Sequence, residues 1–175
     1  MKIQNKTLNE NDIIHKYLKK LNFKKKESFF FNNDGAFLKN KKNYQIIVTN
    51  DTIIENIDFF KTDDPSSIAQ KIITYNLSDL SAMGALPETY TLSLSLPKGV
   101  NIFLLKKFIK KLYYLQNKYK FFLIGGDIGK SKQLVISANF FGYSKKKFII
   151  KRKSNKIGNT IWVTGNIGDS LIGFL

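Results

Sequence analysis

The spacing of hydrophobic residues along the chain predicts an alternation of helices and strands. Apolar residues three and four positions apart predict helices, whereas strict alternation of apolar and polar residues predicts half-buried strands. Residues 89–96 show the second pattern most clearly, because every even position is apolar and every odd position is threonine or serine. The predicted helices cover residues 9–21, 64–84 and 102–119, and the predicted strands cover residues 28–31, 44–48, 89–96, 121–124, 134–141 and 161–164.

The helix predicted over residues 64–84 carries the least regular pattern. Asp64, which is followed by proline, is typical of a helix start, because Asp caps free N–H groups and proline suits the first helical position. Gly84 is typical of a helix end. Asn76 and Asp79 interrupt a stripe of apolar residues at helical spacing. Two interpretations stay open: a partly solvated stripe in which Asp79 faces water, or a polar site built into the helix.

The composition bounds the class of protein. A length of 175 residues suffices for one domain, or for one domain and part of a second. A hydrophobic content of 43% indicates a folded chain. The lack of cysteine excludes disulfides, thiolate metal sites and a cysteine nucleophile within it. We find neither a signal peptide nor a membrane span of about 20 apolar residues, so we expect a cytoplasmic protein with no membrane partner.

The charge balance is strongly basic. Lysine and arginine total 29 against 13 acidic residues, which gives a formal net charge of +16. Such a balance is typical of proteins that bind nucleic acid or another anionic surface. A bias of composition toward lysine, asparagine, isoleucine and phenylalanine explains it equally. Because the lysine runs are spread along the chain without an RNP-like or zinc-finger pattern, nucleic-acid binding is the less favoured interpretation.

One short motif resembles a phosphate-binding P-loop but fails its requirements. Gly129, Lys130 and Ser131 match the end of the motif, which requires a glycine five residues earlier. Position 124 is isoleucine. The motif also requires a following helix, whose N-terminal amides hold the phosphate, whereas residues 134–141 predict a strand. We therefore exclude a P-loop.

Four separate acidic residues remain as candidates for chemistry. Asp34, Asp51, Asp79 and Asp127 each lie at a predicted turn, at a strand end or on the irregular helix stripe. The single histidine, His15, has no visible partner. Carboxylates without cysteine or histidine suit hard cations such as Mg²⁺, which prefers a few carboxylates together with phosphate oxygens. This set indicates a magnesium–nucleotide enzyme that transfers phosphoryl groups.

Residues 76–85, which read Asn-Leu-Ser-Asp-Leu-Ser-Ala-Met-Gly-Ala, closely resemble a signature of the thiamine-monophosphate kinase family, within the wider aminoimidazole ribonucleotide synthetase-like superfamily. Other segments resemble the family's motifs in the same order. These are Asn-Asp-Gly-Ala at residues 33–36, Thr-Asn-Asp-Thr at 49–52, Leu-Ile-Gly-Gly-Asp at 123–127, Arg152, Trp-Val-Thr-Gly at 162–165 and Gly-Asp-Ser at 168–170. The resemblance covers nearly the whole chain.

The resemblance implies an α/β (α+β) fold. An N-terminal aminoimidazole ribonucleotide synthetase-like domain would contain a mixed or antiparallel sheet, flanked by helices, that pairs across the two-fold of a homodimer. Residues 1–153 would form this ATP- and magnesium-binding domain, and residues 154–175 would begin a truncated C-terminal domain. The apolar run over residues 171–175 fits this expectation, because an apolar face needs another layer to cover it.

The resemblance also implies an activity and a site. The reaction would be phosphorylation of thiamine monophosphate by ATP to thiamine diphosphate, through direct in-line transfer without an enzyme nucleophile. Several Mg²⁺ ions would lie between the phosphates. The implied metal ligands are Asp34, Thr49, Asn50, Asp51, Asp79 and Asp127; the implied ATP contacts are Gly126, Asp127 and Arg152; the implied substrate contact is Asp58.

The chain departs from the family's motifs at four positions. Asn32 and Asn33 replace a glycine and an acid at the first turn, and Ile128 replaces a threonine after Gly-Gly-Asp. Asp58 stands where the family has a substrate-contacting histidine, and a carboxylate repels a substrate phosphate unless a cation intervenes. Two alternatives therefore stay open: a sister enzyme of the superfamily that uses ATP on another substrate, and a basic nucleic-acid-binding domain with a degenerate site.

Overall fold

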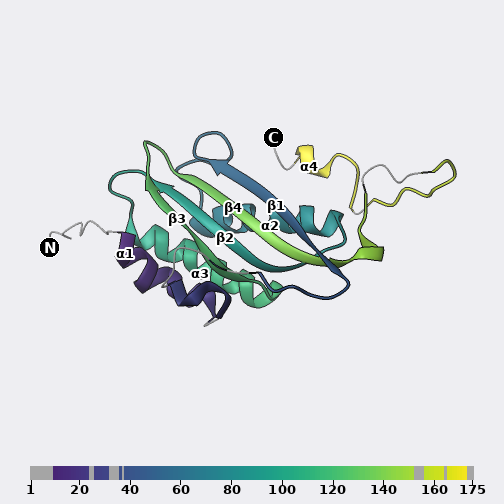
Figure 1. The fold of residues 1–175 in the computed structure, drawn as a ribbon. Coiled ribbons are helices and arrows are strands. Elements are labelled where there is room, and N and C mark those ends of the chain that lie inside the picture. The colour runs from purple at the N-terminus through teal and green to yellow at the C-terminus, as the bar shows by residue number, and fades with distance from the viewer. Residues whose placement is uncertain are drawn as a thin grey trace.

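The computed structural model describes residues 10–23, 26–31, 36, 38–151, 156–163 and 165–172. Figure 1 shows one sheet with helices packed against it. The helices and strands, in chain order, are α1 (Glu10–Ile13), the π-helical turn η1 (Ile14–Leu18), the 3₁₀ helices η2 (Lys19–Asn22) and η3 (Lys26–Phe31), β1 (Tyr44–Ile54), α2 (Pro65–Ala82), β2 (Leu86–Leu96), α3 (Ile102–Tyr119), β3 (Phe122–Lys130), β4 (Val135–Lys145), the 3₁₀ turn η4 (Lys146–Phe148) and α4 (Asp169–Ile172).

The four strands form one mixed sheet in the order β1-β4-β2-β3. β4 pairs antiparallel with both β1 and β2, whereas β2 and β3 are parallel. A parallel pair needs a crossover connection, which α3 provides. α2 and α3 lie side by side against one face of the sheet (Figure 1). This arrangement confirms the predicted mixed sheet flanked by helices; its pairing across a dimer two-fold stays a prediction.

The core lies between the sheet and the two long helices, and three aromatic rings occupy its centre. The rings of Tyr90 and Phe140 stack with centroids 4.9 Å apart, and Phe121 meets both edge-on at 5.4 and 5.0 Å. Such offset and edge-on pairs stabilise the fold by more than the apolar area that they bury would provide. Burial raises the pKa of the Tyr90 hydroxyl, which therefore stays protonated.

A fully buried amide, Gln116 on α3, connects this core to the N-terminal helices. Its Nε2 donates to the carbonyl oxygen of Leu21 at 2.6 Å and to that of Phe121 at 3.4 Å. The Tyr90 hydroxyl donates to Gln116 Oε1 at 3.3 Å. Because a buried polar group without a partner is costly, this one side chain holds three segments in register.

The boundaries of α2 agree with the sequence prediction. Asp64 caps the helix, since its Oδ1 accepts a hydrogen bond from the Ser66 amide at 3.2 Å, and proline occupies the first helical position. Gly84 has φ of 70° just beyond the last turn. A Cβ at Gly84 would lie 2.7 Å from the carbonyl oxygen of Phe148, so only glycine fits there.

The predicted helix over residues 9–21 is wrong in its continuity. The chain forms α1, then a π-helical turn and a 3₁₀ helix, and ends with Phe23 in the left-handed region. Leu18 and Leu21 are nevertheless both buried in the core. The apolar spacing thus predicted a helical segment but not the change of helix type within it.

Two predicted strands are also wrong. Residues 28–31 belong to η3, where Phe29 and Phe30 have φ of 47° and 58°, values that a strand does not contain. Residues 161–163 form no strand, and Trp162 is 90% exposed. A strand requires a neighbour for its backbone hydrogen bonds, and neither segment pairs with a described strand.

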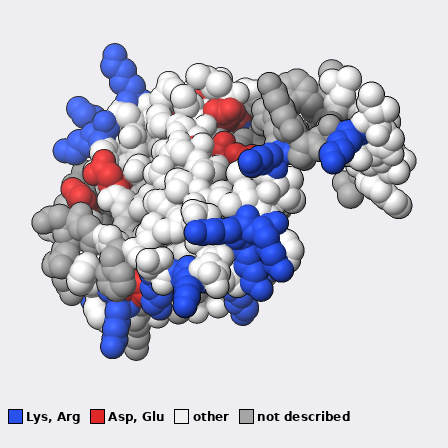
Figure 2. Space-filling model, turned by 45° about the vertical axis from the view of Figure 1, so that its right-hand side comes forward, with Lys and Arg blue, Asp and Glu red and all other residues white. Residues whose placement is uncertain are grey.

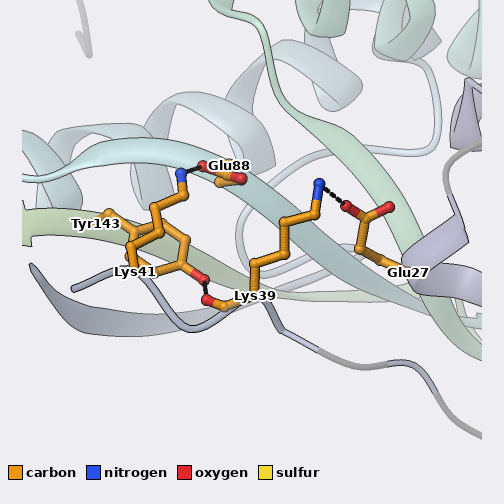
Figure 3. Close-up of polar contacts among 5 residues, drawn as sticks. All are labelled: Glu27, Lys39, Lys41, Glu88 and Tyr143. Atoms are coloured by element: carbon orange, nitrogen blue, oxygen red, sulfur yellow. Dashed lines mark hydrogen bonds and ion pairs between the residues drawn. The ribbon is translucent and has the colours of Figure 1, made fainter.

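A set of polar contacts fixes the segment before β1 to the sheet (Figure 3). The Lys41 ammonium pairs with Glu88 and lies 4.1 Å from the centroid of the Tyr143 ring. The Tyr143 hydroxyl donates to the carbonyl oxygen of Lys39, whose ammonium pairs with the buried Glu27 of η3 at 2.5 Å. These contacts hold η3 near the sheet without strand pairing.

None of the helices in the described part of the chain combines the length and the apolar character that a membrane crossing requires.

We predict that Gln116→Met destabilises the chain by about 1–3 kcal/mol, because the buried Leu21 carbonyl and Tyr90 hydroxyl lose their partner. Urea unfolding followed by circular dichroism measures this change. Asn117→Met is the matched control, since the exposed Asn117 amide bonds to the carbonyl of Tyr113 in its own helix. Equal stability of the two variants would contradict the role given to Gln116.

Candidate functional site

Three polar side chains meet where α2 crosses β1. Alternation along β1 turns Thr49 and Asp51 toward the helices, because they pair with the core residues Phe140 and Ala138 of β4. Asp79 comes from the last turns of α2, and its Oδ2 accepts a hydrogen bond from the Thr49 hydroxyl at 3.1 Å. The two segments that the sequence singled out are thus brought together by the packing of α2 on the sheet.

The electrostatics of this cluster favour a cation. Asp51 Oδ2 is buried and has no hydrogen-bond partner in the described structure. Burial, and secondly the negative charge of Asp79, raise the pKa of Asp51 above its ordinary value. A buried carboxylate oxygen without a donor, beside a second carboxylate, is an unfavourable arrangement that a bound cation would relieve.

The donor set fits Mg²⁺ in combination with phosphate. Two carboxylates and one hydroxyl are hard oxygen ligands, which suit Mg²⁺ or Ca²⁺ rather than softer metals. Within the described ranges, no group of three or more His, Cys, Asp and Glu side chains is placed to hold a metal. Since Mg²⁺ commonly takes one or two carboxylates and completes its shell with water and substrate phosphates, two carboxylates suffice.

Asn50 lies on the opposite, open face of the sheet from this cluster. Its Nδ2 donates to Asn139 Oδ1 on β4, and Asn139 Nδ2 donates to Thr91 Oγ1 on β2 at 3.1 Å. In the next row, Thr52 Oγ1 donates to Ser137 Oγ at 2.9 Å. The open face therefore carries a polar ladder across three strands, and Asn50 does not share a side with Asp51.

Asp127 also lies away from the cluster. The strand register aligns it with Ser93 on β2, which pairs with Ser137 on β4 and through it with Thr52 on β1. Paired residues share a face, so Asp127 extends the polar ladder of the open face. Because β3 and β1 are three strands apart, roughly 14 Å, Asp127 and Asp51 cannot bind the same ion.

Gly126 is required by a close approach of two strands. The pairing of β2 and β3 shifts register between Tyr90 and Thr91. A Cβ at Gly126 would lie 1.9 Å from the carbonyl oxygen of Leu92, so any side chain would force the strands apart. The glycine before Asp127 therefore has a structural role here as well as the ATP contact that the resemblance implies.

Asp58 supports the turn that follows β1. Its Oδ2 accepts a hydrogen bond from the Ile54 amide at 2.8 Å, and its carbonyl oxygen accepts one from the Lys71 ammonium. The carboxylate is thus engaged with backbone. Two further site residues predicted from the sequence, Asp34 and Arg152, lie outside the described residues, as do Asn32 and Asn33.

Asn139 and Ser137 of the polar ladder are polar residues of β4 that the sequence did not single out as candidates. The sequence does contain a pattern that indicates them, because these polar residues alternate with Ile136, Ala138 and Phe140, which are buried, in the predicted strand. The exclusion of a P-loop is confirmed, since the segment after Gly129 leads into β4 instead of a helix.

Comparison with known proteins relates the site to named relatives. The chain is 39% identical over 166 residues to a protein named thiamine-monophosphate kinase from Buchnera aphidicola subsp. Acyrthosiphon pisum, covering 94% of this chain and 50% of that protein. It is similar to the solved thiamine-monophosphate kinase from Stenotrophomonas maltophilia K279a, with 33% identity, a TM-score of 0.73, and coverage of 80% and 44%. The chain spans about half the length of the curated relatives that it matches.

The name of a second similar solved structure includes two ligands. "AaThiL complexed with AMPPCP and TMP" aligns with a TM-score of 0.72 and 27% identity, over 78% of this chain and 43% of that one. The family described as "AIR synthase related protein, N-terminal domain" matches residues 32–143, which contain β1, α2, β2, α3 and β3. Because this match covers more than half of the chain, the protein belongs to the AIR synthase related family through its N-terminal domain.

Proposed function

We propose that this chain is part of a thiamine-monophosphate kinase, which phosphorylates thiamine monophosphate with ATP to give thiamine diphosphate. The observation that carries the proposal is the cluster of Thr49, Asp51 and Asp79, in which a buried carboxylate oxygen lacks a partner. These residues belong to the two segments that resemble the kinase motifs. The names of the relatives and the AMPPCP and TMP in the description of one similar structure support it.

We infer that Asp51, Asp79 and Thr49 hold one Mg²⁺, which would neutralise phosphate charge during transfer. Asp127 is proposed as a ligand of a different ion, because it lies on the other face and three strands away. Asn50 and Asp34 complete the proposed metal ligands. Gly126, Asp127 and Arg152 are the proposed ATP contacts, and Asp58 is the proposed substrate contact.

In this proposal the chain positions phosphates and supplies no nucleophile. Asp51 and Asp79 hold the proposed Mg²⁺ at one position, where it balances phosphate charge. The guanidinium of Arg152 offers paired donors to phosphate oxygens. An oxygen of the substrate phosphate attacks the γ-phosphorus of ATP in line, and the bond to ADP breaks. The single histidine, His15, lies on η1 and has no part in the proposal.

The same proposal covers assembly and location. We propose a cytoplasmic homodimer in which the open face of the sheet pairs with a second copy. Ile46 and Val48 on this face are 40% and 58% exposed, which supports a partner there. Residues 1–153 are proposed as the N-terminal domain and residues 154–175 as the start of the next. The described residues from 156 onward contribute nothing to the core, in agreement with this boundary.

A sister enzyme of the superfamily that uses ATP on another substrate is the second candidate. Asp58, where the family has histidine, favours it. Nucleic-acid binding finds less support, because the lysines on the face shown in Figure 2 form separate groups instead of one continuous stripe. An activity assay of the full-length protein against several phosphorylated substrates separates the first two candidates.

We predict that the chain binds a non-hydrolysable ATP analogue only with Mg²⁺, and that Asp79→Asn or Asp51→Asn weakens this binding by more than about tenfold. Removing a direct metal ligand should exceed the loss of a ligand's supporting contact, which alone costs about 10–100-fold. Isothermal titration calorimetry with and without Mg²⁺ measures the effect. Asp127→Asn should weaken binding as well.

Asp12→Asn is the matched control for these variants, because Asp12 lies on α1 and pairs with Lys16 at 2.5 Å, outside the cluster. Its affinity for the analogue should equal that of the unchanged chain. Equal affinity of Asp79→Asn and Asp12→Asn for the analogue would show that the cluster is not part of the nucleotide site. A full-length protein that binds no nucleotide would refute the kinase proposal.

We also predict that Asp51→Asn raises the melting temperature at pH 7 without Mg²⁺. The raised pKa of Asp51 means that folding favours its protonated form. The stability from this group is fully present below its ordinary pKa of 3.8 and is lost as the pH rises through the higher folded value. The gain should therefore vanish as the pH falls below the ordinary pKa, where both side chains are neutral.

With Mg²⁺ present, the unchanged chain should have the higher melting temperature, because the ion stabilises it through the charged Asp51 and does not stabilise the variant. Scanning calorimetry between pH 3 and 8 gives both results. A lower melting temperature for Asp51→Asn at pH 7 without metal would show that the carboxylate stabilises the fold by itself, contrary to the site proposed here.

A further inference from the structure

An apolar cavity of about 250 Å³ lies at the end of the sheet beyond the acidic cluster. It is lined by the last residues of β2, the first residues of β4, the starting turns of α2 and α3 and the segment between β1 and α2, and it is partly open to solvent. Its apolar wall includes Ile68, Leu94, Leu105, Phe108, Leu134 and Ile136. A dry cavity of about 150 Å³ accommodates benzene, so this one has room for a somewhat larger hydrocarbon group.

Three lysines, Lys61, Lys98 and Lys132, line the same cavity. None of them forms a salt bridge with a carboxylate of the described residues. The two acids of the lining are already engaged. Glu55 accepts a hydrogen bond from the Leu134 amide at 2.8 Å, and Asp63 accepts one from the Phe60 amide at 3.0 Å. Three ammonium groups therefore stand against two carboxylates in the lining, which leaves a net positive charge beside an apolar hollow.

We propose that this cavity binds a small amphiphilic carboxylate, whose hydrocarbon part fills the apolar hollow and whose anionic head is held by the three lysines. Lysine side chains suit this role, because their methylene stems cover apolar surface while the ammonium reaches a polar head. Burial of hydrocarbon supplies the driving force, and the lysines select the sign of the charge. A cationic or neutral head lacks this second contribution.

The cavity is separate from the acidic cluster. Pro65, at the start of α2, lines the cavity, whereas Asp79 lies fourteen residues later on the same helix. At 1.5 Å per residue this is about 21 Å. Asp58 is not among the lining residues, and its carboxylate is bonded to the Ile54 amide. Binding in the cavity is therefore independent of the proposed kinase reaction.

Three probes of equal chain length test the proposal: octanoate, octan-1-ol and octylammonium. Isothermal titration calorimetry of the chain should show one octanoate site, with octanoate bound at least tenfold more tightly than octylammonium. Exchange of Lys61, Lys98 and Lys132 for glutamine should weaken octanoate at least tenfold and leave octan-1-ol unchanged. The matched control exchanges Lys106, Lys110 and Lys118 of α3, which do not line the cavity and should have no effect.

A variant that fills the hollow tests the apolar part. Leu104 lines the cavity and is 47% exposed, so Leu104→Trp should fold and should weaken both octanoate and octan-1-ol at least tenfold. Circular dichroism checks folding; if this variant unfolds, the lysine exchange decides alone. Equal binding of octanoate and octylammonium would overturn the proposal. Displacement of octanoate by thiamine monophosphate would also overturn it, because the cavity would then belong to the kinase substrate.

Discussion

The packing of α2 and α3 against one face of the sheet is the constraint on which the other features depend. It buries the inward residues of β2 and β4 and leaves the second face of the sheet open. It also sets the position along β1 at which α2 crosses that strand, and so brings Asp79 within hydrogen-bond distance of Thr49. A shift of α2 by one turn, about 5.4 Å, would separate the two halves of the cluster while leaving both elements intact.

The acidic cluster is destabilising within an otherwise consistent domain. Asp51 keeps a buried oxygen without a donor, and the Oδ1 of the fully buried Asn76, one turn before Asp79, is also unpartnered in the described structure. Folded proteins seldom retain such groups unless a ligand or a function uses them. These unpartnered oxygens lie where the capped α2 and the paired β1 hold both carboxylates in place. A bound cation would therefore lower the free energy of the folded state there.

The inner face of the sheet changes its chemistry along its length. Near the end of α2 it presents carboxylates, and near the start of α2 it presents an apolar hollow with lysines. Both regions belong to the same two-layer packing of α2 and α3 on the sheet. The open face differs again, since it carries the polar ladder of Asn50, Asn139 and Thr91.

The sequence by itself determined the long elements and the identity of the chemical groups. Period-two alternation predicted β2, and the Asp-Pro start and glycine end predicted α2. The site for a hard cation that the ordered acids indicate stays a prediction. These features are local: capping, turn geometry and side-chain direction depend on residues a few positions apart. The predicted link between the segment around Asp51 and the segment around Asp79 agrees with their contact in space.

Only the tertiary structure decided which acids lie close together. Asp127 lies on the open face because of the register between β2 and β3 and the shift between Tyr90 and Thr91, and a one-residue change of register would turn it to the other face. Such long-range packing and pairing decide the face on which a residue lies, and no local pattern encodes them.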